Sequence, residues 1–158
     1  MTAIATIGVY GFTLEGFLER LRAAQVGMVI DVRQRRGVRG PEYAWANSRN
    51  LQRALWAAEV EYLHRLDLAP TTELRNLQYA EDDRAGVGKR SRVELAGEYR
   101  ERYLREILDR ADLDDLVRRL PASGTAAFLC VEADARACHR SLIAGRLAER
   151  YGYAVDDL

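Results

Sequence analysis

Apolar segments of strand length alternate along this chain with segments whose apolar residues recur at helical spacing, and this alternation restricts the fold more than any other feature. The strand-like segments comprise residues 4–9, 28–32, 60–66 and 125–131, with a short fifth candidate at residues 153–155. Strands that are separated by helices run parallel, because each helix carries the chain back across a face of the sheet. The pattern therefore predicts an α/β fold with a single domain, a Rossmann-like parallel sheet of about four or five strands, and helices on both faces.

The segments between these strands carry helical periodicity and residues suited to helix caps. Thr13 can cap a first helix, in which Leu14, Phe17 and Leu21 fall on one face. We expect a short helix after residue 72 and further helices over residues 47–59, 93–108, 112–120 and 138–151.

Length and composition restrict the class of protein. The chain has 158 residues, which suits one α/β domain spanning residues 1–158. Its 24 basic and 24 acidic side chains cancel, so the molecule as a whole offers no electrostatic attraction to nucleic acid. No apolar run approaches the ~20 residues of a membrane span, and the first residues lack the pattern of a secretory signal. We therefore expect a cytoplasmic protein without membrane contact, in which the cysteines are reduced.

Reactive side chains concentrate between Cys130 and Arg140, directly after the most apolar strand. This stretch contains both cysteines of the chain, one of its two histidines, and Glu132. A turn from a strand into a helix directs loop side chains and free helix N–H groups toward one crevice. Polar residues also lie at the carboxyl ends of three other predicted strands, in Gly8-Val9-Tyr10, Asp31-Val32-Arg33 and His64-Arg65. Because the carboxyl ends of parallel strands share one edge of the sheet, the sequence predicts a polar site at that edge.

Cys138, His139 and Glu132 are the candidate catalytic residues. The positive end of a helix favours a thiolate, so Cys138, at or just before a first helical turn, is a candidate nucleophile. His139 would act as a base near pH 7, and Glu132 is a second candidate base. Each has a structural alternative, since a buried thiol packs as a small hydrophobe and Glu132 can form an orienting ion pair with Arg33 or Arg140.

Arginines crowd the predicted loop over residues 34–47 and the residue before it. Arg33, Arg35 and Arg36 are candidate ligands for phosphate, because a guanidinium can bind such a group through two parallel hydrogen bonds. A solvated charged loop is the alternative interpretation. The other candidates for this binding site are Tyr10, Asp31 and Arg140, with Lys89, Arg90 and Arg92 if their own loop folds over the same edge.

Metal binding and a phosphatase-type loop receive less support. Cys130, Cys138, His139 and Glu132 carry donor atoms that zinc accepts, but their spacing matches no common zinc module, so we predict no metal and no cofactor. Cys130 and Arg136 have the spacing of a tyrosine-phosphatase phosphate loop. No glycine lies between them, and acidic residues inside the segment would place negative charge beside the phosphate, which argues against that interpretation.

Four short motifs follow one another along nearly the whole chain. They are Thr6-Ile7-Gly8, Asp31-Val32-Arg33, Cys130-Val131-Glu132 and Cys138-His139-Arg140. In this order and spacing they resemble the family catalogued as domain of unknown function 488. The resemblance implies a compact α/β fold with a parallel sheet and a site at these motifs, and it implies no particular reaction. Many relatives carry a His-Ser pair after Thr-Ile-Gly, whereas this chain has Val9 and Tyr10, so chemistry that depends on that imidazole has no counterpart here.

These observations support three hypotheses about function. In the first, the protein binds or acts on a phosphate-bearing ligand, a nucleotide or nucleic acid, and Glu132 or His139 transfers a proton. In the second, it is a thiol-dependent enzyme that uses Cys138. In the third, it is a non-catalytic DNA- or protein-binding domain whose polar motif braces the fold. We prefer the first, because the arginine loop and a helix N-terminus are predicted to meet at strand carboxyl ends. The sequence leaves the oligomeric state open.

Overall fold

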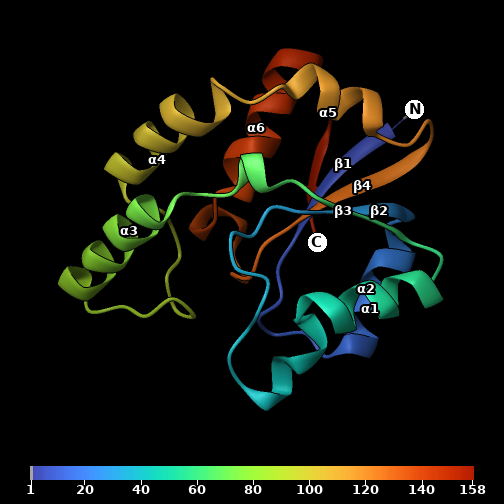
Figure 1. Cartoon of the computed structure of the whole chain (residues 1–158), viewed down its shortest axis with the longest axis horizontal. Helices are drawn as coiled ribbons and strands as arrows, with labels where there is room; N and C mark the ends of the chain where they lie inside the picture. Colours follow the sequence, from blue (N-terminus) through green and yellow to red (C-terminus); the bar gives the residue numbers. More distant parts are fainter. Residues whose placement is uncertain (1) are drawn as a thin grey trace.

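One five-stranded sheet organises the computed structural model, which describes residues 2–158. The strand order is β3-β2-β4-β1-β5, and every neighbouring pair of strands is parallel (Figure 1). This arrangement confirms the predicted α/β fold with a Rossmann-like parallel sheet. The strands are β1 (Thr2–Ile7), β2 (Val26–Asp31), β3 (Glu61–His64), β4 (Gly124–Leu129) and β5 (Val155–Asp157).

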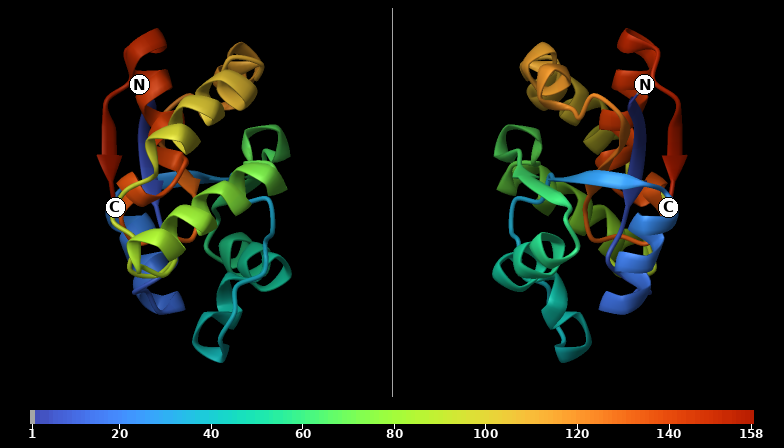
Figure 2. Two further views of the ribbon diagram at one scale, coloured as in Figure 1. Left: turned by 90° about the vertical axis from the view of Figure 1, so that its left-hand side faces the viewer. Right: turned by 90° about the vertical axis from the view of Figure 1, so that its right-hand side faces the viewer.

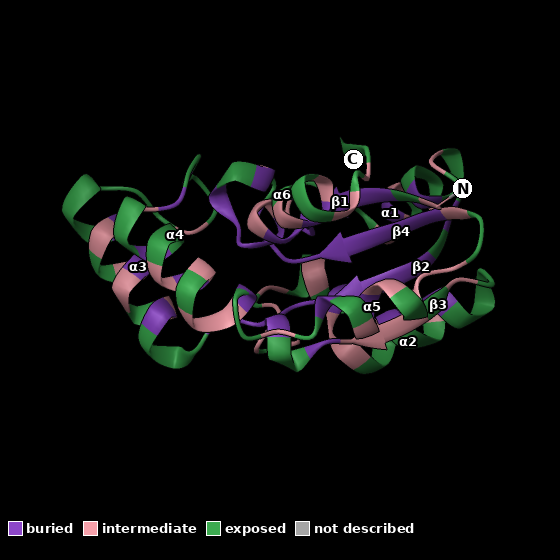
Figure 3. Cartoon of the chain, turned by 90° about the horizontal axis from the view of Figure 1, so that it is seen from above, coloured by how far each residue is buried: buried purple, intermediate pink, exposed green. Residues whose placement is uncertain are grey.

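Helices cover both faces of the sheet. α1 and α2 lie on one face, and α5 and α6 lie on the opposite face (Figures 1 and 2). α3 and α4 project beyond the carboxyl ends of the strands (Figure 3). The helices are α1 (Leu14–Ala23), α2 (Ser48–Ala57), α3 (Thr72–Ala85), α4 (Gly97–Tyr103), α5 (Leu113–Arg119) and α6 (Arg140–Tyr151).

The core surrounds the central strands, and β4 is buried over nearly its full length (Figure 3). The inward face predicted for α1 is confirmed for Phe17 and Leu21, which are both buried. The predicted cap is confirmed as well, because the Thr13 hydroxyl accepts a hydrogen bond of 3.1 Å from the backbone N–H of Gly16. Across residues 2–158, none of the helices combines the length and the apolar character needed to cross a membrane.

Helix α3 is longer than the sequence pattern predicts. It begins where the Thr71 hydroxyl accepts a hydrogen bond of 3.2 Å from the N–H of Leu74. It ends at Gly86, whose φ of 70° lies in the left-handed region that glycine adopts without a steric penalty. Its inward positions include the polar residues Gln78 and Asp82, which weaken the apolar period on which a sequence-based helix prediction depends.

The order of the strands creates a crevice beside β4. β4 lies between β2 and β1, whose following helices cover one face of the sheet. α6, the helix that follows β4, covers the other face. The chain therefore leaves these adjacent strands toward opposite faces of the sheet. In open α/β sheets, ligands bind in the crevice that forms at such a point.

Candidate functional site

A cleft of about 740 Å³ opens at the carboxyl ends of the strands. Segments that follow β1, β2 and β4 contribute to it, and so do α3, α4 and the loop between them. One lining side chain is a carboxylate, that of Glu132. The basic side chains that line it are Arg33, Arg35, Arg39, Arg75, Lys89, Arg90 and Arg92. This excess of positive over negative charge makes the cleft suited to anions.

The structure brings most of the predicted site residues together. The predicted residues that line the cleft are Tyr10, Arg33, Arg35, Glu132, Cys138 and His139, together with Lys89, Arg90 and Arg92 from the second loop. Asp31, Arg36 and Arg140 lie outside this lining. Arg36 instead donates a hydrogen bond of 3.3 Å to the Tyr62 hydroxyl.

Asp31 and Arg33 form a fully buried ion pair. Arg33 Nε and Nη2 donate to the two carboxylate oxygens of Asp31 at 2.9 and 2.8 Å, and Nη1 donates to the Ala46 carbonyl at 2.9 Å. Tyr62 adds a hydrogen bond of 2.6 Å from its hydroxyl to Asp31. Burial opposes the charge of Arg33, but the bonded Asp31 carboxylate outweighs burial and raises the pKa of this guanidinium. Its three nitrogens all have partners, so this pair fixes the end of β2.

Arg140 holds the loop that follows β4. This residue is 1% exposed, and its guanidinium donates to the carbonyls of Glu132 and Ala133 at 2.6 and 3.3 Å. Gly8 presses on the same loop, because a Cβ atom at this position would lie 2.1 Å from the Glu132 carbonyl oxygen. Both contacts act on the backbone of this loop and so fix the place of the Glu132 side chain.

Glu132 and Arg92 form an ion pair in the floor of the cleft. Arg92 Nη2 donates to Glu132 Oε1 at 2.9 Å, and Arg92 Nη1 donates to Asp82 of α3 at 2.6 Å. Glu132 Oε2 is buried and has no hydrogen-bond partner among residues 2–158. Burial and the nearby Cys130 raise the pKa of Glu132, against the opposing effect of Lys89 and Arg92. An unpartnered buried oxygen in a cleft wall suits a proton, a water or a ligand.

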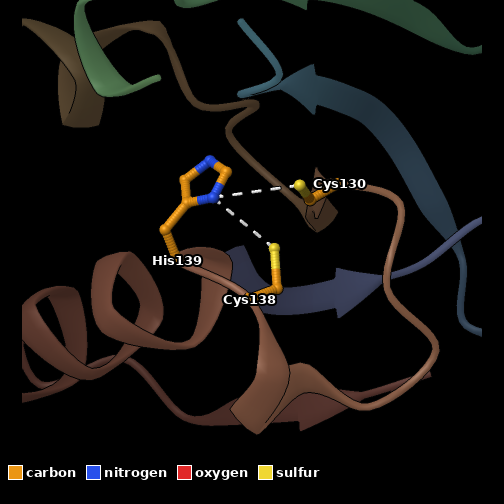
Figure 4. Close-up of side chains that lie close together, drawn as sticks. All are labelled: Cys130, Cys138 and His139. Carbon is orange, nitrogen blue, oxygen red and sulfur yellow. Dashed lines mark hydrogen bonds between the residues drawn. The ribbon is translucent and has the colours of Figure 1, made fainter. Parts of the chain in front are cut away.

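The two cysteines and His139 form a compact cluster at the same edge (Figure 4). His139 Nδ1 lies 3.6 Å from Cys138 Sγ and 3.8 Å from Cys130 Sγ. Its Nε2 lies 2.7 Å from the Val32 carbonyl oxygen, which can only accept a hydrogen bond. Nε2 therefore carries the hydrogen, and in the neutral ring Nδ1 directs its lone pair toward both sulfurs.

Both thiols are buried and unpaired. Burial, with the neighbouring Cys138, raises the pKa of Cys130 to about 12, so this group is a thiol at neutral pH. Cys138 has an extended backbone and precedes α6, whose N-cap is His139. The short turn at Ala135–Ala137 folds the chain back between the two cysteines. The sequence spacing did not indicate this cluster, because the turn alone brings its members together.

Several cleft residues were not identified from the sequence. α3 supplies Arg75, Tyr79 and the partner carboxylate Asp82, and α4 supplies Tyr99. Arg75 donates to the Tyr79 hydroxyl at 3.0 Å, four residues along the same helix. The polar face of α3 was the sequence feature that could have identified them. This helix projects past the sheet, so its side chains need not be apolar.

These features define the class: an α/β protein with a parallel sheet, a basic cleft at the strand carboxyl ends, and a Cys/Cys/His cluster in that cleft. Residues 13–147 match the family described as "Domain of unknown function DUF488", and the chain belongs to this family. Comparison with the curated proteins and with the solved structures gave no match.

Proposed function

We propose that the cleft binds a phosphate-bearing ligand, a nucleotide or the backbone of a nucleic acid. The observation that carries this proposal is the charge of the lining, in which seven side chains are basic and one is acidic. Arg33 and Arg92 are neutralised by buried carboxylates. Within residues 2–158, four lining cations have no carboxylate within 4.0 Å, so they stay available to an anion: Arg35, Arg39, Arg75 and Lys89.

Tyrosines in the cleft support a nucleotide over a bare phosphate. Tyr10 packs against Tyr43 with ring centroids 5.3 Å apart, and the Arg90 guanidinium lies 5.1 Å from the Tyr10 centroid. Arg75 lies 5.7 Å from the centroid of Tyr79 on another wall. Aromatic and guanidinium planes of this kind stack on bases, while the remaining cations contact phosphate.

Binding in low salt tests this proposal. The probes are a fluorescently labelled ATP analogue and a labelled single-stranded oligonucleotide, whose anisotropy is followed across a salt series. Lys89→Gln and Arg39→Gln should each weaken binding and reduce the salt slope by about one, the share of one phosphate contact. Arg22→Gln, on an exposed position near the end of α1, is the matched control and should leave both quantities unchanged. Absence of binding at low salt, or equal weakening by the control, would overturn the proposal.

A thiol-dependent enzyme is the second candidate, on one specific observation. His139 Nδ1 lies 3.6 Å from Cys138 Sγ, the relationship of a base to a nucleophile that it activates. Turnover of a phosphate-bearing substrate that is lost in Cys138→Ser, with ligand affinity retained, would select this candidate. The third candidate, a non-catalytic DNA- or protein-binding domain, would be selected if changing Cys138 or Glu132 lowered thermal stability and altered neither ligand binding nor turnover. The unpaired state of both cysteines supports the cytoplasm, a reducing compartment, as the location.

A further inference from the structure

We infer that Cys130, Cys138 and His139 form a binding site for a thiophilic divalent cation of the zinc class, with a fourth coordination position open to the cleft. The three donor atoms, Sγ, Sγ and Nδ1, all lie within 4.8 Å of one another. Two sulfurs and one imidazole nitrogen match the ligand preferences of Zn²⁺. The inference concerns the cluster alone and stands whether or not the cleft binds phosphate.

The distances fit tetrahedral coordination. With Zn–S of about 2.3 Å and Zn–N of about 2.0–2.1 Å, a tetrahedral ion separates a sulfur from a nitrogen ligand by about 3.5–3.6 Å. The two Nδ1···Sγ distances are 3.6 Å for Cys138 and 3.8 Å for Cys130. A shift of a few tenths of an ångström by Cys130 would bring its Sγ to the tetrahedral distance from Nδ1, and all three donor atoms already lie within 4.8 Å of one another.

The surroundings of His139 orient it as a metal ligand. A ligating histidine typically donates its second N–H to a carboxylate or a backbone carbonyl, which fixes the tautomer and the plane of the ring. Here Nε2 meets the Val32 carbonyl at 2.7 Å, and Nδ1 faces the sulfurs (Figure 4). The Tyr103 ring packs against the imidazole with centroids 5.5 Å apart and restricts its rotation further.

The cluster leaves room for a ligand that the protein does not supply. All three side chains line the cleft, and so does Glu132, whose Oε2 is buried without a partner. Three protein ligands with an open fourth position characterise catalytic rather than structural zinc sites. A water molecule or an anion would occupy that position on the cleft side, where the Glu132 carboxylate could accept a hydrogen bond from a bound water.

Cobalt substitution tests the site directly. The full-length protein, reduced and stripped with a chelator, is titrated with Co²⁺ alone and then with Zn²⁺. We expect one ion per chain, thiolate-to-cobalt absorption in the near ultraviolet, intense visible bands of tetrahedral Co²⁺, and loss of both on addition of Zn²⁺. A change in the visible bands on addition of imidazole would report the open position. Stoichiometric binding without thiolate absorption, or no binding at all, would overturn the inference.

Variants and labelling keep the test independent of folding defects. Loss of an outer-shell partner lowers metal affinity about 10–100-fold, so Cys138→Ser and His139→Ala should each weaken zinc binding by more than about 100-fold. His64→Asn removes the other histidine and is the matched control, expected to bind zinc as the unaltered protein does. If a variant fails to fold by circular dichroism, alkylation of the unaltered protein decides instead. Zinc should slow labelling of Cys138, and equal labelling of Cys138 with and without zinc would refute the site.

Discussion

Arg92 provides the sharpest test of the buried charges below the cleft. Its side chain is 6% exposed, and the guanidinium joins Asp82, Glu132 and the Ala137 carbonyl, the last at 3.2 Å from Nε and 3.0 Å from Nη2. Arg92→Met keeps much of the apolar stem but leaves two buried carboxylates without their cation. Removal of one partner from a buried ion pair costs about 3–5 kcal/mol. We expect the free energy of unfolding at pH 7 to fall by that amount.

Protonation limits this loss and gives it a pH dependence. For a carboxyl group of ordinary pKa 4.5, taking up a proton costs about 3.4 kcal/mol at pH 7 and about 0.7 kcal/mol at pH 5. Burial already raises the pKa of Glu132, and Arg92 opposes that shift, so loss of Arg92 raises this pKa further. A raised pKa favours the folded state below pH 4.5, and this advantage is lost as pH rises through the folded-state value. The deficit of the variant should therefore shrink between pH 7 and pH 5.

Urea denaturation followed by circular dichroism at pH 7 and pH 5 measures both quantities, with a chelator and a reductant present. Arg90→Met is the control, since Arg90 is exposed and its pairing with Glu42, at 3.4 Å, is exposed as well. Adding Glu132→Gln to Arg92→Met should restore part of the stability, because one unpaired charge is removed. A loss below about 1 kcal/mol at pH 7, or an equal loss at both pH values, would refute a buried Arg92 network.

Three further predictions concern the strand ends. Gly8→Ala should lower the thermal unfolding temperature and cost about 1–3 kcal/mol, because its Cβ would overlap the Glu132 carbonyl; an unchanged melt would contradict the close approach. Asp31→Asn should cost about 3–5 kcal/mol in urea denaturation, because it leaves the Arg33 guanidinium buried without a charge partner; a loss below about 1 kcal/mol would contradict this. In metal-free protein, Cys130 should resist iodoacetamide at neutral pH and react increasingly as pH rises from 9.0 toward about 12, and fast labelling at pH 7 would contradict the raised pKa. Over that interval the stability that the neutral thiol contributes should be lost.

The sheet was predictable because its signals are local. The three central strands, β1, β2 and β4, are short and largely apolar runs, and in the helix after β1 Thr13 caps and Phe17 is buried as the pattern predicts. The same locality explains why α3 was predicted only as a short helix. Its inward face carries Gln78 and Asp82, whose partners, Ala96 and Arg92, come from the following segment. A sequence pattern reports the polarity of a side chain but gives no information about a partner that a later loop supplies.

The candidate site likewise has one part that the sequence predicts and another part that it does not. That Tyr10, Arg33 and Glu132, which follow β1, β2 and β4, share one edge follows from parallel strands, because the carboxyl ends of those strands must coincide. The direction of a side chain depends on which backbone carbonyls are free nearby. Arg140 belongs to the same motif as Cys138 and His139, but its guanidinium lies in the interior, where it donates hydrogen bonds to the carbonyls of Glu132 and Ala133. The cluster of thiols and imidazole depends in turn on one short turn, whose effect on distances the sequence spacing does not reveal.

The chemistry gathers at the end of β4 because of where the chain turns. The segments that leave β1 and β2 go to one face and the segment that leaves β4 goes to the other, so no helix fills the space between them. Such a crevice exposes backbone and polar groups that a packed core would exclude. α3 and α4 then enclose the crevice from beyond the strand ends (Figure 3), and α3 and the loop that follows it add cations to it. The cationic walls repel one another, so the anion proposed for the cleft would be electrostatically favourable there. Under the two proposals, an anion would lie against these walls and a metal ion would be held by Cys130, Cys138 and His139, so the proposals concern separate groups of one cleft.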